Sequence, residues 1–201
     1  IGMAVGTAAL IIILSIYNGF DALVKSMLSS IEPDLAIVPA EGKFFVPQGE
    51  VYDWLYDCPQ VRTMCTTLQD YVEYDGRRGT AMVKGVDDIY KEESPVSEHL
   101  TGGEFVLDKG EIRYAAVGQG FASHMGINHT FVTPMRLYYP DREARFSAAN
   151  PMSAVNMVRV WPSCEFSLNA EVDNTLVIVS MDVMQNILSL EDEVSAVEIR
   201  V

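Results

Sequence analysis

The first 17 residues limit most strongly what this chain can fold into, because they carry no charged side chain. A membrane-spanning helix needs about 20 apolar residues and rarely fewer than about 17, so the stretch is long enough for most of such a helix. An acidic sequence of mixed pattern follows it directly. We therefore expect a membrane protein, with the end of a spanning helix continuing outward over residues 1–31 and an exported domain over residues 32–201.

The way this apolar run ends bears on two alternatives. A secretory signal peptide closes on a small-x-small cleavage site, whereas this run passes into Asn18-Gly19-Phe20. A buried helix of a soluble protein stays open as the second alternative, because apolar stretches near this length also occur in large cores. The four-residue spacing of Leu23, Met27 and Ile31 favours a helix that continues outward until Pro33.

The acidic balance of the chain limits its partners. Asp and Glu outnumber Lys and Arg by 28 to 14, which gives a formal net charge of −14. Nucleic-acid binding depends on clustered cations, so we expect no nucleic-acid partner. An acidic exterior favours a basic soluble partner, although solubility alone explains it more simply.

Cysteine and histidine positions indicate no metal or redox site. Cys58, Cys65 and Cys164 contain no Cys-x-x-Cys pair, and the three histidines stand apart. Cys58 and Cys65 either stay buried as small residues or pair in an oxidising compartment, and the sequence leaves this open. We expect neither a metal nor a cofactor.

Period-two alternation predicts strands over much of the remaining chain. Residues 68–74 and 80–86 flank Asp75-Gly76, which is the strongest short hairpin signal. Further strands are predicted at residues 34–38, 104–107, 112–117, 130–139, 156–161, 175–179 and 194–201.

Helical patterns are fewer and short. Helices are predicted at residues 51–56, at 118–125 with Gly126 as a left-handed cap, and after Ser180 as far as Leu188. Residues 87–98 are charged and are predicted to form a loop. Together these elements indicate an α+β fold.

Two small patterns suggest enzyme chemistry only weakly. Gly118-x-Gly120 precedes a predicted helix, as in dinucleotide-binding turns, but Ser123 stands where the third glycine belongs, so a tight turn is the preferred interpretation. Glu171 and Asp173 would point the same way in a strand and could form an acid/base pair. With no P-loop, nucleophile or metal ligand, we expect no catalytic residue and no enzyme.

The connection between the strands predicted at residues 130–139 and 156–161 is much longer than the two to five residues of a normal hairpin loop. It carries Arg142 and Arg145 within an acidic chain. Long loops of this kind are usually functional or disordered, so the segment is a candidate binding element.

Four blocks of sequence, in this order, carry a family resemblance. They are the apolar run ending in Leu14-Ser15 and Asn18-Gly19-Phe20, then Lys84-Gly85-Val86-Asp87, then Gly120-Phe-Ala-Ser-His-Met-Gly126-Ile127, and last Phe166 with Asn169, Glu171, Val172 and Asp173. Together they resemble Lol-type lipoprotein-releasing ABC transporter permeases (the LolC/LolE family), within the MacB/FtsX-like permease superfamily.

This resemblance implies a MacB-like periplasmic core domain between the first two transmembrane helices of an inner-membrane permease. The implied fold is α+β, a mixed sheet with helices, an inserted subdomain and a protruding hairpin. The implied partners are a second permease subunit, cytoplasmic ABC ATPase subunits, a periplasmic lipoprotein carrier and the lipoprotein substrate. Asn128-His129 departs from the Gly-Asp frequent in the family, so a MacB-like efflux permease or an FtsX-like periplasmic activator domain remains an alternative.

The resemblance also implies two sites. The family's carrier-binding hook corresponds to about residues 138–156, with candidate contacts at Tyr138, Tyr139, Arg142, Arg145, Phe146, Pro151 and Met152. The end of the first helix is expected to line an apolar cavity for the acyl chains of the substrate, ordinary lipid contact being the alternative. Its candidate residues are Ile13, Ile16, Tyr17 and Phe20.

Overall fold

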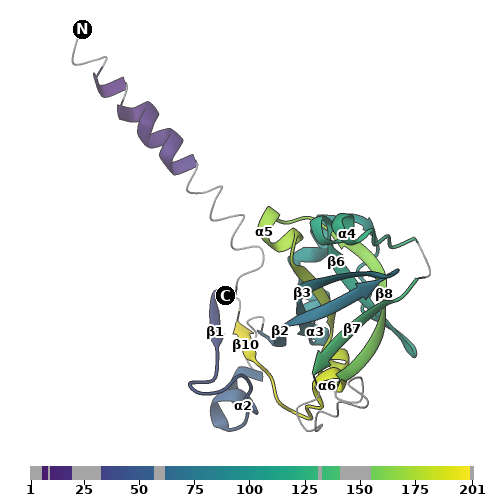
Figure 1. The fold of residues 1–201 in the computed structure, drawn as a ribbon. Helices are drawn as coiled ribbons and strands as arrows, with labels where there is room; N and C mark the ends of the chain where they lie inside the picture. The colour runs from purple at the N-terminus through teal and green to yellow at the C-terminus, as the bar shows by residue number, and fades with distance from the viewer. Residues whose placement is uncertain are drawn as a thin grey trace. The chain divides into compact units, whose positions relative to one another are not determined.

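The computed structural model describes residues 6–8, 10–19, 33–56, 62–130, 133–140 and 155–199. The chain falls into two units, residues 1–32 and residues 33–201 (Figure 1). In the first, residues 6–8 and 10–19 are helical. No helix in the described part of the chain combines the length and apolar character needed to cross a membrane. The predicted continuation over residues 20–31 lies outside the described residues.

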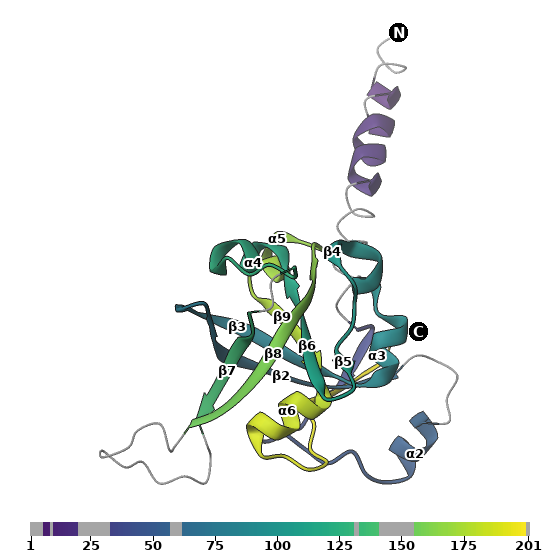
Figure 2. The same cartoon turned by 90° about the vertical axis from the view of Figure 1, so that its right-hand side faces the viewer.

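The second unit is built around a sheet that closes on itself, which we call the closed sheet. Each of six strands pairs with two neighbours in the order β2, β3, β9, β6, β8, β7 and back to β2. The β3–β9 and β6–β8 pairs are parallel and the other four are antiparallel (Figures 1 and 2). The strands are β2 (Arg62–Tyr74), β3 (Arg77–Val86), β6 (Ile112–Gly118), β7 (Met135–Pro140), β8 (Val155–Phe166) and β9 (Leu176–Ser180). The predicted mixed α+β fold is confirmed.

The interior of the closed sheet forms the main core. Because strand side chains alternate between the two faces, every strand sends apolar residues inward. Helix α4 (Gln119–Met125) and helix α6 (Met181–Leu188) lie at opposite ends of these strands in both views and add their apolar faces (Figures 1 and 2). Fully buried residues include Val72, Val83, Val117, Leu137, Val160, Val177, Met184 and Ile187.

An outer core covers the other face of part of the sheet. Helix α3 (Asp88–Glu93) and the 3-10 helix η1 (Pro95–His99) bring Tyr90 and Val96 against Phe166 and Ile178. The prediction of a loop over residues 87–98 was therefore wrong. The Asp87 side chain accepts a hydrogen bond from the Tyr90 N–H at 3.0 Å, which starts the helix despite its many charges.

The first and last strands of this unit lie side by side at one edge. Strand β1 (Leu35–Ile37) pairs antiparallel with β10 (Ala196–Ile199), and β10 pairs with the start of β2. Leu35 lies opposite Ile199. The chain therefore enters and leaves the domain at neighbouring positions. Between β1 and β2, helix α2 spans Glu50–Tyr56, close to its predicted range.

A hairpin turn and a helix cap have the conformations predicted from the sequence. The β2–β3 turn has φ of 46° at Asp75 and 77° at Gly76, as a type I′ hairpin requires. Gly126 caps α4 with φ of 71°.

The prediction of a strand at residues 104–107 was wrong. The residues that pair lie on either side of this range, in β4 (Leu100–Gly103) and β5 (Asp108–Lys109).

Candidate partner-binding surface

The β7 and β8 strands form the base of the predicted hook. They pair antiparallel from Met135↔Val160 to Pro140↔Val155, so the connection between them spans residues 141–154. Tyr138 and Tyr139 lie at this base. The other predicted hook residues lie outside the described residues: Arg142, Arg145, Phe146, Pro151 and Met152.

The two tyrosines have different surroundings because they alternate on β7. Tyr139 packs partly buried against the main core, so it also anchors the hairpin base. Tyr138 lies opposite Met157 on β8, and Tyr71 of β2 is its register partner on the other side. Met157 is 42 % exposed. An apolar side chain therefore reaches solvent beside the start of the predicted hook.

A row of charged residues crosses four strands, and its β7–β8 pair, Arg136↔Arg159, lies next to Met135↔Val160 at the end of the pairing away from the connection. Glu73 on β2 lies opposite Arg78 on β3 and Arg136 on β7, and Arg136 lies opposite Arg159 on β8. Glu73 accepts from Arg78 Nε at 3.2 Å and from Arg136 at 2.8 Å. Arg159 is exposed and forms no ion pair with any residue in the described ranges. We call Arg78, Glu73, Arg136 and Arg159 the arginine row.

The arginine row has an excess of positive charge, since one carboxylate stands among three guanidinium groups. Arg78 is 66 % and Arg136 is 44 % exposed at the side chain. Guanidinium groups bind carboxylates through parallel hydrogen bonds, so the row can contact acidic groups on a partner. Sequence reasoning missed these residues because only strand register brings them together.

The predicted acyl-chain cavity is only partly described. Ile13, Ile16 and Tyr17 lie on the helical segment of the first unit and are 64 %, 67 % and 67 % exposed. Phe20 lies outside the described residues. Apolar side chains exposed to this degree are available to contact lipid or another apolar surface.

The Gly118-x-Gly120 segment is a tightly packed turn, as preferred from the sequence. A Cβ on Gly118 would lie 2.5 Å from the backbone oxygen of Asp173, and one on Gly120 would overlap the Asn174 side chain. The start of α4 is therefore covered by helix α5 (Ala170–Asp173).

The suggested Glu171/Asp173 pair does not form. These residues lie on α5 and not on a strand, so the expectation that they point the same way was wrong. Asp173 is buried and accepts hydrogen bonds of 2.7 Å from Ser167 Oγ and the Leu168 N–H. Its carboxylate therefore holds a turn in place.

Cys164 and His129 have surroundings that fit a role in packing. Cys164 is fully buried, as predicted, and burial raises its pKa to about 11, with a smaller contribution from the Glu165 charge and an opposing hydrogen bond from Ser163. His129 Nδ1 lies 2.9 Å from Glu165. A Cys58–Cys65 disulfide lies outside what the structure describes. Within the described ranges, no group of three or more His, Cys, Asp or Glu residues is arranged to hold a metal ion.

The fold defines the class as an α+β domain with a mixed sheet, entered and left at one edge, in which a long connection joins two strands that carry part of the arginine row. The sequence profile of the MacB-like periplasmic core domain matches residues 1–135. The chain belongs to this family and is the periplasmic domain of an ABC-transporter permease of the MacB and FtsX type.

Solved structures of similar fold are distant in sequence. The extracellular domain of the noncanonic ABC-type transporter YknZ from Gram-positive bacteria superposes with a TM-score of 0.50 at 10 % identity, over 81 % of this chain and 75 % of that one. The periplasmic region of MacB from Actinobacillus actinomycetemcomitans has a TM-score of 0.49 at 9 % identity, over 79 % and 72 %. No curated protein matches the sequence.

Proposed function

We propose that this domain belongs to a permease that releases lipoproteins from the inner membrane and passes them to a periplasmic carrier, as in the LolC/LolE family. The observation that carries the proposal is the β7–β8 hairpin, whose long connection follows directly from a pair of strands bearing the arginine row. In this proposal residues 138–156 form the carrier-binding hook, and the arginine row contacts acidic groups of the carrier.

The neighbouring first and last strands of the second unit support an inserted domain. Because Leu35 pairs with Ile199, segments that precede and follow the domain start from one edge, which suits an insertion between two consecutive membrane helices. The full permease then pairs with a second permease subunit, and cytoplasmic ABC ATPase subunits supply the energy. This domain has no catalytic role in the proposal.

The substrate would contact the first unit. Ile13, Ile16 and Tyr17 are exposed on a helical segment, and an apolar surface at bilayer depth holds acyl chains without a desolvation penalty. Phe20, the fourth candidate residue, lies outside the described residues. Acyl-chain crosslinking from a photoreactive residue at position 16 tests this assignment, with Thr7 as the polar control position.

The hook assignment is tested by replacing residues 141–154 with Asn-Gly. Pro140 and Val155 are register partners, so a two-residue type I′ turn closes the strands without disturbing the pairs below it. We expect binding of the organism's periplasmic lipoprotein carrier to be lost while the melting temperature stays within about 2 °C. Full retention of binding contradicts the hook.

A point variant tests the contribution of charge to carrier binding separately from that of residues 141–154. Arg159→Ala is expected to weaken carrier binding about fivefold, whereas Lys109→Ala, an exposed cation on β5, leaves it unchanged. Pull-down of a cell-wall hydrolase in place of the carrier would favour an FtsX-like activator domain. If cells carrying the variant that lacks residues 141–154 still release lipoproteins but show altered drug resistance, the result would favour an efflux permease.

A further inference from the structure

One polar side chain ties the base of the β7–β8 hairpin to helix α6. Asn156 is the second residue of β8, and its register partner on β7 is Tyr139. The Asn156 Nδ2 donates a hydrogen bond to the Ile187 carbonyl at 3.0 Å and lies 3.4 Å from Ser189 Oγ. Side chains of register partners lie on the same face of a sheet, and Tyr139 packs against the main core. The hairpin base is therefore held on one strand by the core and on the other by α6.

The bond from Asn156 is made at the C-terminal end of α6. The last four carbonyl groups of a helix have no partner within the helix, and Ile187 is the next to last residue of α6. Asn156 reaches this carbonyl from β8, a different element. The end of the helix is therefore joined directly to the hairpin base.

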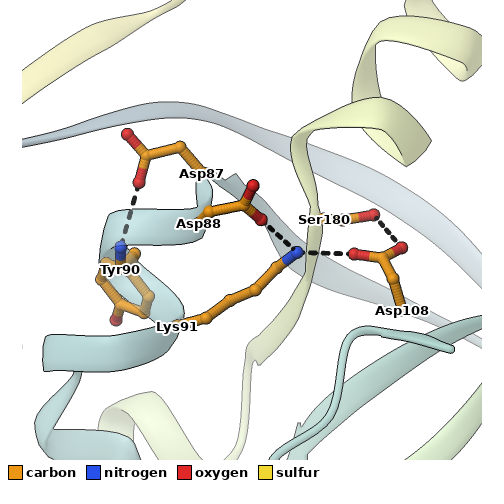
Figure 3. A network of polar contacts seen from close by, with 6 residues as sticks. All are labelled: Asp87, Asp88, Tyr90, Lys91, Asp108 and Ser180. Carbon is orange, nitrogen blue, oxygen red and sulfur yellow. Dashed lines mark hydrogen bonds and ion pairs between the residues drawn. The ribbon is translucent and has the colours of Figure 1, made fainter.

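The N-terminal end of α6 is held by a separate contact, drawn in Figure 3. Ser180 occupies the cap position of α6 but makes no capping hydrogen bond with its side chain. Its Oγ donates to Asp108 on β5 at 2.9 Å (Figure 3). Lys91 Nζ of α3 lies 2.6 Å from the other carboxylate oxygen of Asp108 and 2.7 Å from Asp88. A serine at this position usually stabilises its own helix by capping it, whereas here the hydroxyl links α6 to β5 and, through Lys91, to α3.

Helix α6 spans the distance between these two contacts. Its eight residues rise about 12 Å. Val183, Met184 and Ile187 are fully buried in the main core, which holds one face of the helix. Hydrogen bonds are directional, so those at the two ends resist a shift of the helix along its axis. A helix fixed at both ends can transmit the position of β5 and α3 to the hairpin base.

We propose that α6 acts as a strut for the hairpin base, with Asn156 as the positioning residue and Ser180 as the anchor at the far end. The strut sets the direction in which the chain leaves β7 at Pro140 and returns to β8 at Val155. That residues 141–154 bind a carrier rests on the proposed function, whereas the strut does not. In a carrier-binding hook, a base that is already fixed lowers the conformational cost of binding.

Amide hydrogen exchange of the whole chain tests the strut without any partner. Asn156→Ala removes the bond to the end of α6, and Ser180→Ala removes the anchor at its start. Exchange of the backbone amides in residues 135–140 and 155–160 should become about fivefold faster in Asn156→Ala, as expected for the loss of one hydrogen bond of ordinary strength. Ser180→Ala acts through the helix and should give an increase of at least about twofold. Asn156→Gln keeps an amide donor and should recover most of the protection.

Asn174→Ala is the matched control, because Asn174 also donates its side-chain amide to a helix carbonyl, that of Ala170 on α5. It should leave exchange at the hairpin base unchanged. Residues 114–118 of β6 provide an internal reference for opening of the whole domain. Unchanged exchange in Asn156→Ala, or an equal increase in Asn174→Ala, would overturn the proposal. So would unchanged exchange in Ser180→Ala, since Asn156 would then be only a local contact.

Binding of the organism's periplasmic lipoprotein carrier separates this inference from the proposed function. Asn156→Ala and Ser180→Ala are expected to weaken binding about fivefold and about twofold, and Asn174→Ala should leave it unchanged. If the wild-type chain does not bind the carrier but exchange changes as expected, the hook assignment fails and the strut stands. If the carrier binds all of these chains equally and exchange at the hairpin base does not change, the strut fails and the hook assignment stands.

Discussion

Lys84 and Glu198 form an ion pair inside the domain, with the Lys84 Nζ 2.7 and 2.8 Å from the two carboxylate oxygens. Their side chains are 7 % and 11 % exposed. The same ammonium lies 5.1 Å from the centre of the Tyr90 ring, a favourable cation–π position. Because β10 pairs along its backbone with β2 and not with β3, this ion pair adds a side-chain link from the last strand to the closed sheet.

Removing one member of the pair should destabilise the domain more than removing both. Lys84→Met leaves a buried carboxylate and Glu198→Leu leaves a buried ammonium, and such single changes cost about 3–5 kcal/mol. Lys84→Met combined with Glu198→Leu removes both charges and should cost less than either single change. Urea unfolding of the four chains measures this. Additive losses in the double variant would show that the two charges are not coupled.

Local signals explain the correct predictions from sequence. Asp75-Gly76 specifies a turn that needs positive φ at both positions, and Gly126 supplies the left-handed cap that ends α4. Helix α3 was not predicted because most of its residues are charged. Its buried residue, Tyr90, is 2 % exposed and packs in the outer core. A single buried aromatic in a charged run is too weak a periodic signal.

Pairings between distant segments explain what the sequence could not predict. The sheet closes because Val72 pairs with Leu137, and strand patterns do not identify partners across such a separation. The arginine row depends on that same closure, since Glu73 contacts Arg136 only where β2 meets β7. Likewise, the serine predicted to cap α6 occupies the cap position, but its hydroxyl donates to Asp108.

Gly118→Ala should destabilise the domain by about 1–3 kcal/mol. Its new Cβ would lie 2.5 Å from the Asp173 backbone oxygen, which cannot move without shifting α5. Gly79→Ala is the matched control, because its Cβ would meet the flexible Met125 side chain at 3.0 Å. Thermal unfolding compares the two. An equal loss at both positions would contradict the close packing of α4 on α5.

Stability should fall at alkaline pH through Cys164. Its pKa is raised to about 11 because burial disfavours the thiolate, whereas an unfolded cysteine ionises near pH 8.5–9. The contribution is therefore complete below about pH 8 and is lost as pH rises toward about 11, with about 1.4–2 kcal/mol lost at pH 10. Urea unfolding from pH 7 to pH 10, compared with Cys164→Ala, isolates this group. Parallel pH profiles of the two chains would refute it.

Lys91→Met should cost about 1 kcal/mol at neutral pH. Burial lowers the pKa of Lys91, but its hydrogen bonds to Asp108 and Asp88 outweigh burial and leave the pKa raised. The folded pKa thus lies above the unfolded value near 10.4, so the contribution is constant below about pH 10 and is lost as pH rises through the folded pKa. The difference in unfolding free energy between wild type and variant should therefore shrink only at strongly alkaline pH. Shrinkage already between pH 7 and pH 9 would contradict this assignment.

Glu73→Gln tests whether the arginine row is held together by charge. The substitution keeps the shape and a hydrogen-bonding oxygen of the side chain but leaves Arg78 and Arg136 without their shared carboxylate. Like charges on neighbouring strands repel, so we expect a loss of about 1 kcal/mol at low salt. Repulsion is screened when the Debye length falls from about 30 Å at 0.01 M to about 3 Å at 1 M salt, and the loss should shrink accordingly.

Two further variants test whether this result is specific to the arginine row. Glu111→Gln removes a charge at an exposed position between β5 and β6 and should leave stability unchanged at either salt concentration. Adding Arg159→Ala to Glu73→Gln removes the cation that faces Arg136 and should restore most of the stability at low salt. If the loss in Glu73→Gln is instead the same at both salt concentrations, the hydrogen-bond geometry of Glu73, and not its charge, holds the strands together.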